Sequence, residues 1–279
     1  MYETVEEAEL HKKWQQEEDV NAFVVVTSNS SLKGDPVLPK IKQLAMAAKP
    51  SAAFYLLTAS KMPDFLRASS KHDEDEVALF SVKRLHLPSK GGAASFSSTN
   101  LHIEAGPRLL HAGMAELRRW VRLQKVPLVA ELAPMTARDM LSDRRLLGIA
   151  LLKAPPKASQ LLLLKEEATK LIKEKHVSPK DAFLAWVDAK QYRFYVSRVL
   201  LGHAATVNVD EFPEAIILNP VDEIIWRTTP DGTPLDVSHL VTTLVAAQEG
   251  TFQGEMMGSL FRRSTNYINR GVDHFGVYP

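Results

Sequence analysis

The feature that most constrains the fold is a regular alternation of short apolar runs with segments of helical period, a pattern that occurs twice along the chain. In the first half, the apolar runs predict buried strands at 21–28, 51–59 and 77–87. The segments of helical period lie at 5–16, 36–49, 62–70 and 114–125. A Gly- and Ser-rich interruption at 88–100 is expected to be a long loop. Strands that alternate with helices in this way predict a sheet covered by helices.

The pattern restarts after Val126 and Pro127. Predicted strands at 128–132, 146–152 and 183–189 alternate with predicted helices at 136–143, 159–176 and 191–201. Two more apolar runs, 215–219 and 223–227, precede a helix at 236–248 with Asp236 as its N-cap. Parallel strand, helix, strand followed by a hairpin and a final helix is the order of the thioredoxin fold. The fold class is therefore α/β, with two tandem thioredoxin-like domains at 1–125 and 126–250, each a mixed central sheet with helices on both faces, and a tail at 251–279.

Pro213 lies at the start of a predicted strand, although proline has no N–H to donate to a neighbouring strand. In the thioredoxin fold, the segment before the hairpin begins with a cis proline, and no ladder N–H is required at that position. The topology therefore predicts that the Phe212–Pro213 bond is cis. A trans proline at the start of the strand is the alternative.

The chain contains no cysteine, which removes disulfides, thiolate nucleophiles and cysteine-ligated metals together. It also lacks a phosphate-binding glycine loop, a serine nucleophile motif and a zinc-binding histidine pair, and its 9 histidines are dispersed. The acidic run at 73–76 lacks the spacing of a calcium loop, so a solvated turn is expected. We therefore predict no cofactor, no metal site and no enzymatic activity for this segment.

Charge and hydropathy favour neither nucleic-acid binding nor a membrane span. Lys and Arg total 34, Asp and Glu total 33, and the net charge of +1 gives no electrostatic case for nucleic acid. No apolar stretch reaches the roughly 18 residues that a membrane span needs. The N-terminus is acidic where a signal peptide would be basic and then apolar. These features predict a soluble chain without a membrane span.

Four stretches together carry a resemblance to a known family: "LRRWVRLQKVPLVAEL", "TARDMLSDRRLLGIALL", "AFLAWVDA" and "FPEAIILN". They resemble the junction and second half of the b–b′ pair of non-catalytic thioredoxin-like modules in the protein disulfide isomerase family. The most specific match is the helix that ends in the short bridge "KVPLV". The resemblance spans roughly residues 3 to 255. It implies a location in the endoplasmic reticulum lumen and polypeptide binding as the function.

The resemblance also implies a peptide-binding pocket between the first and third helices of the second domain. Carried over by position, the pocket residues are Leu141, Leu152, Phe183, Tyr192 and Tyr195, with Met140 beside them. Leu141 stands where the family has a larger aromatic residue, and Lys153 follows the strand where an apolar residue is usual. Independently of the resemblance, helical spacing predicts that Tyr192, Phe194 and Tyr195 cannot all face the sheet.

The tail is the second candidate for a functional segment. Phe252, Met256 and Phe261 belong to an amphipathic stripe of helical spacing, although three glycines in the same stretch weaken a free helix. In the family, the linker that follows b′ caps the pocket, so the resemblance implies that this stripe caps it here.

Three functional classes follow. The first is a non-catalytic domain pair that binds unfolded or partly folded polypeptides. The second is an adaptor or structural module that holds one folded protein of the secretory pathway. The third, a thiol oxidoreductase, requires catalytic domains that flank this segment, because a serine in place of the missing cysteine cannot perform thiol chemistry.

Overall fold

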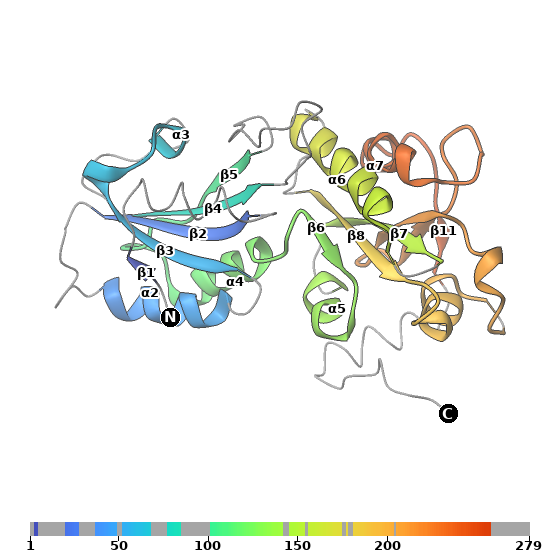
Figure 1. Cartoon of the computed structure of the whole chain (residues 1–279), viewed down its shortest axis with the longest axis horizontal. Helices are drawn as coiled ribbons and strands as arrows, with labels where there is room; N and C mark the ends of the chain where they lie inside the picture. Colours follow the sequence, from blue (N-terminus) through green and yellow to red (C-terminus); the bar gives the residue numbers. More distant parts are fainter. Residues whose placement is uncertain are drawn as a thin grey trace. The chain divides into compact units, whose positions relative to one another are not determined.

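The computed structural model describes residues 3–4, 20–27, 37–48, 52–67, 77–84, 101–141, 145–153, 156–174, 177, 181–203 and 205–257. The chain divides into two compact units, Met1–Pro127 and Leu128–Pro279 (Figure 1). Within the described ranges, no helix is long and apolar enough to cross a membrane.

The first unit is built on a mixed five-stranded sheet with the strand order β1-β3-β2-β4-β5. β2 and β3 pair in parallel, whereas β4 is antiparallel to β2 and β5 is antiparallel to β4. The strands are β1 (Glu3–Thr4), β2 (Val20–Thr27), β3 (Ala53–Thr58), β4 (Ala78–Arg84) and β5 (Leu101–Ala105). The helices are α2 (Val37–Ala48), the 3₁₀ turn η1 (Ala59–Lys61), α3 (Asp64–Arg67) and α4 (Met114–Gln124).

Period-two alternation along β2 distributes the core of the first unit over both faces of the sheet. Phe23 and Val25 are buried in a cluster with residues of α2 and α4. Val24 and Val26 are buried in a second cluster, which includes Leu66 of α3. Figure 1 shows the corresponding layers, with α2 and α4 on one side of the sheet and α3 on the other.

The strands predicted for the first unit are confirmed as β2, β3 and β4. β5 was not predicted, because its sequence "LHIEA" is short and half polar and follows the Gly- and Ser-rich interruption. The predicted helix at 5–16, the acidic turn at 73–76 and the interruption at 88–100 lie outside the described residues.

The second unit contains a six-stranded sheet with the order β11-β10-β9-β7-β8-β6. β6 and β7 are parallel to β8, and the antiparallel strands β9, β10 and β11 follow from β7 outward. The strands are β6 (Val129–Glu131), β7 (Leu146–Leu152), β8 (Ala182–Asp188), β9 (Ala215–Asn219), β10 (Ile224–Trp226) and β11 (Glu255–Met256). The helical segments are α5 (Pro134–Leu141), α6 (Ala158–Lys173), the π-helix η3 (Tyr195–Leu200), the 3₁₀ turns η4 (Val209–Glu211) and η5 (Val237–His239), and α7 (Leu240–Gln248). Parallel strands with helical crossovers, a hairpin and a final helix make this unit thioredoxin-like.

The two faces of the second sheet are distinguished by strand register. Gly148 on β7 lies against α7, since a Cβ placed there would meet Leu240 Cδ2 at 3.3 Å and Leu244 Cδ1 at 3.4 Å. The face that carries Gly148 is called the α7 face below. α6 and α7 lie on the same side of the sheet and α5 lies on the opposite side, which is called the α5 face (Figure 1).

One local prediction for the second unit is confirmed with a refinement, and another is wrong in type. The helix predicted at 191–201 is present, and six of its residues form the π-helix η3. The tail stripe predicted at helical spacing contributes strand β11 instead, because residues 255 and 256 pair with β10.

Candidate functional site

The position at which a catalytic thioredoxin domain carries its cysteines is the N-terminus of α6, and here it contains no thiol. α6 begins at Ala158, after Lys157. The end of β7 and the segment that contains Pro213 lie together beside it, because the Leu151 N–H donates to Glu214 O at 2.8 Å and Lys153 Nζ donates to Asp210 O at 3.0 Å. The cis state of the Phe212–Pro213 bond stays a prediction.

Four of the five residues carried over as pocket residues are buried core residues. Leu141 and Leu152 are each 4% exposed, Phe183 is 1% exposed and Tyr195 is 7% exposed. Only Tyr192 is half-buried. The four buried side chains therefore offer little surface to a ligand in this conformation.

Strand register separates two of these residues. Phe183 pairs with Leu147, one residue before Gly148, so Phe183 lies on the α5 face. Leu152 pairs with Asp188 and is four residues beyond Gly148, so it lies on the α7 face. Because one surface cannot include both faces of a sheet, the five residues do not converge, and this part of the prediction needs correction.

The ring of Phe183 is covered by a cation. The Arg145 guanidinium carbon lies 4.6 Å from the ring centroid, and Arg145 is itself buried. Such a cation–π contact is favourable, more so when it is shielded from water. Phe183 is thus held by the packing of its own unit.

The aromatic residues after β8 include two that reach solvent. Phe194 is 52% exposed, Tyr192 is half-buried and Tyr195 points into the core. This confirms the prediction that the three rings cannot all face the sheet. Tyr192 and Phe194 together are called the aromatic surface below. Sequence reasoning carried over Tyr192 but missed Phe194, although the same helical spacing pointed to it.

Asp188 positions the segment that carries the aromatic surface. Its Oδ1 accepts hydrogen bonds from the N–H groups of Lys190 at 3.0 Å and Gln191 at 2.8 Å, and its carbonyl accepts from the Tyr192 N–H at 2.9 Å. Partial burial raises the pKa of Tyr192, and the carboxylates of Glu131 and Asp188 raise it further. Two carboxylates therefore act on the Tyr192 hydroxyl.

The π-helix η3 follows the aromatic surface directly. Ser197 fixes it, because its hydroxyl donates to Ala205 O at 3.2 Å and accepts from the Val207 N–H at 3.1 Å. π-helical turns are rare and occur frequently at functional sites. Tyr195, the first residue of η3, is buried, whereas Phe194, the residue before it, is 52% exposed.

Burial of Tyr195 predicts a loss of stability at alkaline pH. Burial raises the pKa of the Tyr195 hydroxyl above its ordinary value of 10.0. Above pH 10.0 the Tyr195 hydroxyl ionises in the unfolded chain but stays protonated in the folded chain. The contribution of the protonated hydroxyl to the free energy of unfolding is therefore complete below pH 10.0 and is lost as the pH rises through the folded pKa. The quantity to follow is the free energy of unfolding of the wild type minus that of Tyr195→Phe. Between pH 10.0 and the folded pKa, this difference is expected to fall by about 1.4 kcal/mol per pH unit. Urea unfolding of both proteins on either side of this pH measures it, and a pH-independent difference contradicts it.

The described part of the tail packs on the α7 face of the second sheet. Phe252 packs against Trp226 of β10, with ring centroids 6.3 Å apart. Trp226 pairs with Ile217, which pairs with Gly148, so this contact is on the α7 face. Phe252 and Met256 thus do not cap a pocket on the α5 face. Phe261 lies outside the described residues, and its capping role stays a prediction.

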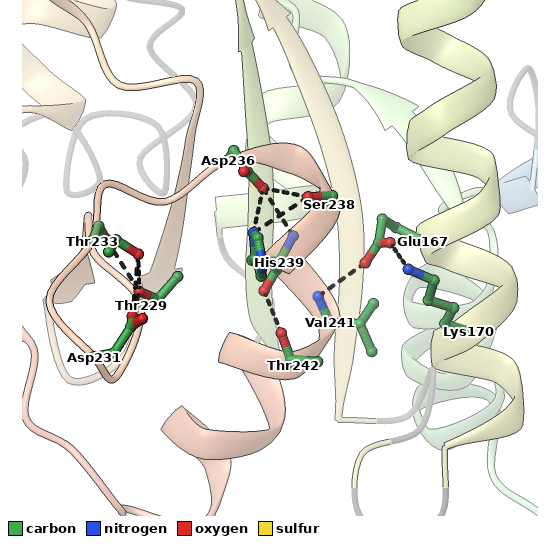
Figure 2. Close-up of polar contacts among 10 residues, drawn as sticks. All are labelled: Glu167, Lys170, Thr229, Asp231, Thr233, Asp236, Ser238, His239, Val241 and Thr242. Carbon is green, nitrogen blue, oxygen red and sulfur yellow. Dashed lines mark hydrogen bonds and ion pairs between the residues drawn. The ribbon is translucent and has the colours of Figure 1, made fainter.

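Polar side chains around the start of α7 resemble a catalytic triad only in composition (Figure 2). Ser238 Oγ and Asp236 Oδ1 both approach the same ring nitrogen, His239 Nδ1, at 3.3 and 2.8 Å. A catalytic histidine uses its two nitrogens separately, one for the serine and one for the carboxylate. Asp236 instead accepts from the His239 N–H at 3.1 Å, so it is the predicted N-cap. Partial burial acts upward on the pKa of Asp236, but hydrogen bonds from Ser238 and His239 hold it below its ordinary value.

The other contacts in Figure 2 are also structural. The buried carboxylate of Glu167 on α6 accepts from the Val241 N–H at 3.4 Å and pairs with Lys170. A negative charge at the N-terminal turn of α7 is favourable because it meets the positive end of the helix dipole. Hydrogen bonds from Thr229 and Thr233 lower the pKa of Asp231 in the neighbouring loop. Among the residues that the structure describes, no group of three or more acidic or histidine side chains could hold a metal.

Among the known proteins compared with this chain, only solved structures are similar to it. No family model and no curated protein matches the chain. The bb fragment of ERp72 is 13% identical, with 89% of this chain and 97% of that chain covered and a TM-score of 0.48. Human ERp44 is 13% identical, with 91% and 67% covered and a TM-score of 0.40. ERdj5 form II is 14% identical, with 89% and 30% covered and a TM-score of 0.30. This chain spans 59% of the human ERp44 form II chain.

All three proteins consist of or contain thioredoxin-like domains of the protein disulfide isomerase family. The fold assignment for this chain rests on its own strand order, with parallel strands joined by helical crossovers and then an antiparallel hairpin. The chain is a tandem of two thioredoxin-like units, similar to solved structures from the protein disulfide isomerase family.

Proposed function

We propose that this chain is a non-catalytic, polypeptide-binding domain pair of a protein disulfide isomerase-like protein of the endoplasmic reticulum lumen. Its second unit binds unfolded or partly folded polypeptide at the aromatic surface formed by Tyr192 and Phe194. The single observation that carries the proposal is the exposure of Phe194, at 52%, beside half-buried Tyr192 at the entry to a π-helix.

The chemistry of the aromatic surface suits an apolar segment of a non-native chain. Fully burying a phenylalanine side chain contributes about 1.5–3 kcal/mol, and aromatic residues are frequent among those that carry most of a binding energy. A single exposed apolar residue is ordinary on a soluble protein, whereas this segment carries a half-exposed phenylalanine and a half-buried tyrosine two residues apart. Glu131 and Asp188, which act on the Tyr192 hydroxyl, favour segments that also carry a basic residue.

The absence of cysteine separates this role from thiol chemistry. Thiol–disulfide exchange requires a thiolate as the attacking group, and this chain has none. Recognition of a non-native polypeptide requires only apolar surface and backbone hydrogen bonding. In this proposal, any disulfide chemistry on the bound polypeptide belongs to other domains or other proteins.

The test is a titration of a fluorescent, reduced and carboxymethylated polypeptide, followed by anisotropy. Phe194→Ala is expected to weaken binding about 10- to 30-fold, the loss typical of an aromatic residue at the centre of an interface. The matched control is Val221→Ala, because Val221 is 55% exposed in the same unit but lies on the β9–β10 turn. Thermal unfolding of both variants should match the wild type.

Two outcomes contradict the proposal. One is that Phe194→Ala binds the unfolded polypeptide as tightly as the wild type, or that Val221→Ala loses as much affinity as Phe194→Ala. The other is that the wild type fails to bind any unfolded polypeptide and binds only a folded protein, which is the behaviour of an adaptor.

A further inference from the structure

The outer edge of the second sheet is closed by a segment that follows the last helix. β11 pairs with β10 through Ile224 with Met256 and Ile225 with Glu255. The Met257 N–H adds a hydrogen bond to Glu223 O at 2.7 Å. β11 is only two residues long, and both residues are exposed. An edge element with few backbone bonds and little buried surface opens at lower free energy than the core strands.

The fit of this segment against β10 depends on glycine. A Cβ placed on Gly254 would lie 2.4 Å from Ile224 Cγ2, 2.7 Å from Trp226 Cε2 and 2.9 Å from Ile225 O. The last of these is a backbone atom and cannot rotate away. Any larger residue at this position is therefore excluded as long as the segment lies on β10.

The residues on both sides of Gly254 are recognised by separate groups. On one side, the ring of Phe252 packs on Trp226 at 6.3 Å. On the other, the Glu255 carboxylate pairs with Arg227, Nη1 to Oε2, at 3.3 Å. Arg227 is held in place independently, because its Nη2 donates to Leu201 O at 2.6 Å. β10 and the residue that follows it thus present an aromatic ring, a position that accepts only glycine, and an oriented cation.

We propose that the edge of β10 is a strand-addition site for extended polypeptide with the pattern aromatic, any residue, glycine, acidic, apolar, and that residues 252–256 occupy it in cis. Extended peptides add to sheet edges through main-chain hydrogen bonds, while side-chain contacts give specificity. The tethered segment competes with an incoming peptide at an effective concentration of roughly millimolar. The site lies along the β10 edge of the sheet and includes neither Tyr192 nor Phe194, so it does not depend on the function proposed for the aromatic surface.

The test uses the full chain and a labelled peptide with the sequence of residues 250–257, "GTFQGEMM". Gly254→Val in the protein is expected to expel the segment and to let the peptide bind. Gln253→Val is the matched control, because it adds the same kind of side chain one residue away at an exposed position. The peptide should bind the wild type and Gln253→Val at least about ten-fold more weakly, because the site is then occupied in most molecules. Hydrogen exchange of the β10 amides should slow when the peptide binds Gly254→Val.

Several controls keep the outcome decisive. Glu255→Arg replaces the ion pair with Arg227 by two like charges and expels the segment without a side chain pressed against the β10 backbone, so it replaces Gly254→Val if that variant loses cooperative unfolding. The same peptide with valine in place of its glycine should not bind either variant. Equal affinity for the wild type and for the expelled variants overturns the proposal, as does no binding to a variant that unfolds cooperatively. A dimer of the wild type by light scattering also overturns it, since a second copy is then the occupant.

Discussion

Leu141→Asp is expected to unfold the second unit, not to leave a folded protein with a blocked binding site. Leu141 is 4% exposed at the end of α5, on the side of the sheet that carries Phe183. An unpaired carboxylate at such a position costs several kcal/mol, about 3–5 by analogy with a broken buried ion pair. Circular dichroism during urea unfolding should show that the transition of the second unit is lost or shifted to low urea.

The matched control for Leu141→Asp places the same charge on an exposed apolar residue. Phe194→Asp should change the free energy of unfolding by no more than about 0.5 kcal/mol, as is usual for surface substitutions. It should also abolish binding of unfolded polypeptide. If Leu141→Asp instead unfolds like the wild type and loses binding, Leu141 lines a pocket as the family resemblance implies, and the assignment to the core is wrong.

Phe183→Ala is expected to destabilise the second unit by about 3–5 kcal/mol, the range for truncation of a buried phenylalanine. Phe183 is 1% exposed, and its removal also takes away the ring under the Arg145 guanidinium. The buried Arg145 guanidinium then loses one favourable contact. Phe194→Ala is the control with the same substitution, and its effect on stability should be within about 0.5 kcal/mol. The midpoints and slopes of urea unfolding measure both.

The two phenylalanines thus separate stability from binding. Phe183→Ala should act on folding, and Phe194→Ala should act on affinity. A loss of less than about 1 kcal/mol for Phe183→Ala, with weakened binding, would place Phe183 in a ligand site and contradict the packing described above.

The strands were the part of the fold that the sequence predicted best, for a physical reason. β7 is buried along its whole length, and its seven residues are an unbroken apolar run, so the predicted and observed bounds coincide at Leu146–Leu152. A strand buried on both faces needs no alternation and is visible in composition alone. β5 was missed because it is short and lies at a sheet edge, where polar residues are tolerated.

The direction of the side chains was harder to predict, because it depends on pairing between strands. Leu152 and Phe183 each belong to an apolar run, and each run by itself is compatible with either face. Only the register of β7 against β8 reveals that the two residues lie on opposite faces. Carrying residues over from a family by position therefore joined side chains that the sheet separates.

The tail shows the limit of helical spacing as a signal. Phe252 and Met256 are four residues apart, which suits a helix, but the glycine between them lies against β10 at backbone distance. The three glycines were interpreted as residues that weaken a helix, whereas Gly254 permits close contact with a strand. A partner more than 25 residues away along the chain decides the conformation, and local periodicity contains no information about it.

Site-specific photocrosslinking of an unfolded polypeptide tests the central claim, that the aromatic surface of the second unit binds non-native chains. p-Benzoylphenylalanine is placed in turn at Phe194 and at Leu163, an exposed leucine on α6 at the other side of the sheet. We expect the probe at 194 to crosslink to a reduced, carboxymethylated polypeptide and the probe at 163 to give little product. The same polypeptide in its native fold should crosslink at neither position. Equal crosslinking from both probes, or crosslinking at 194 only to the native fold, would contradict it.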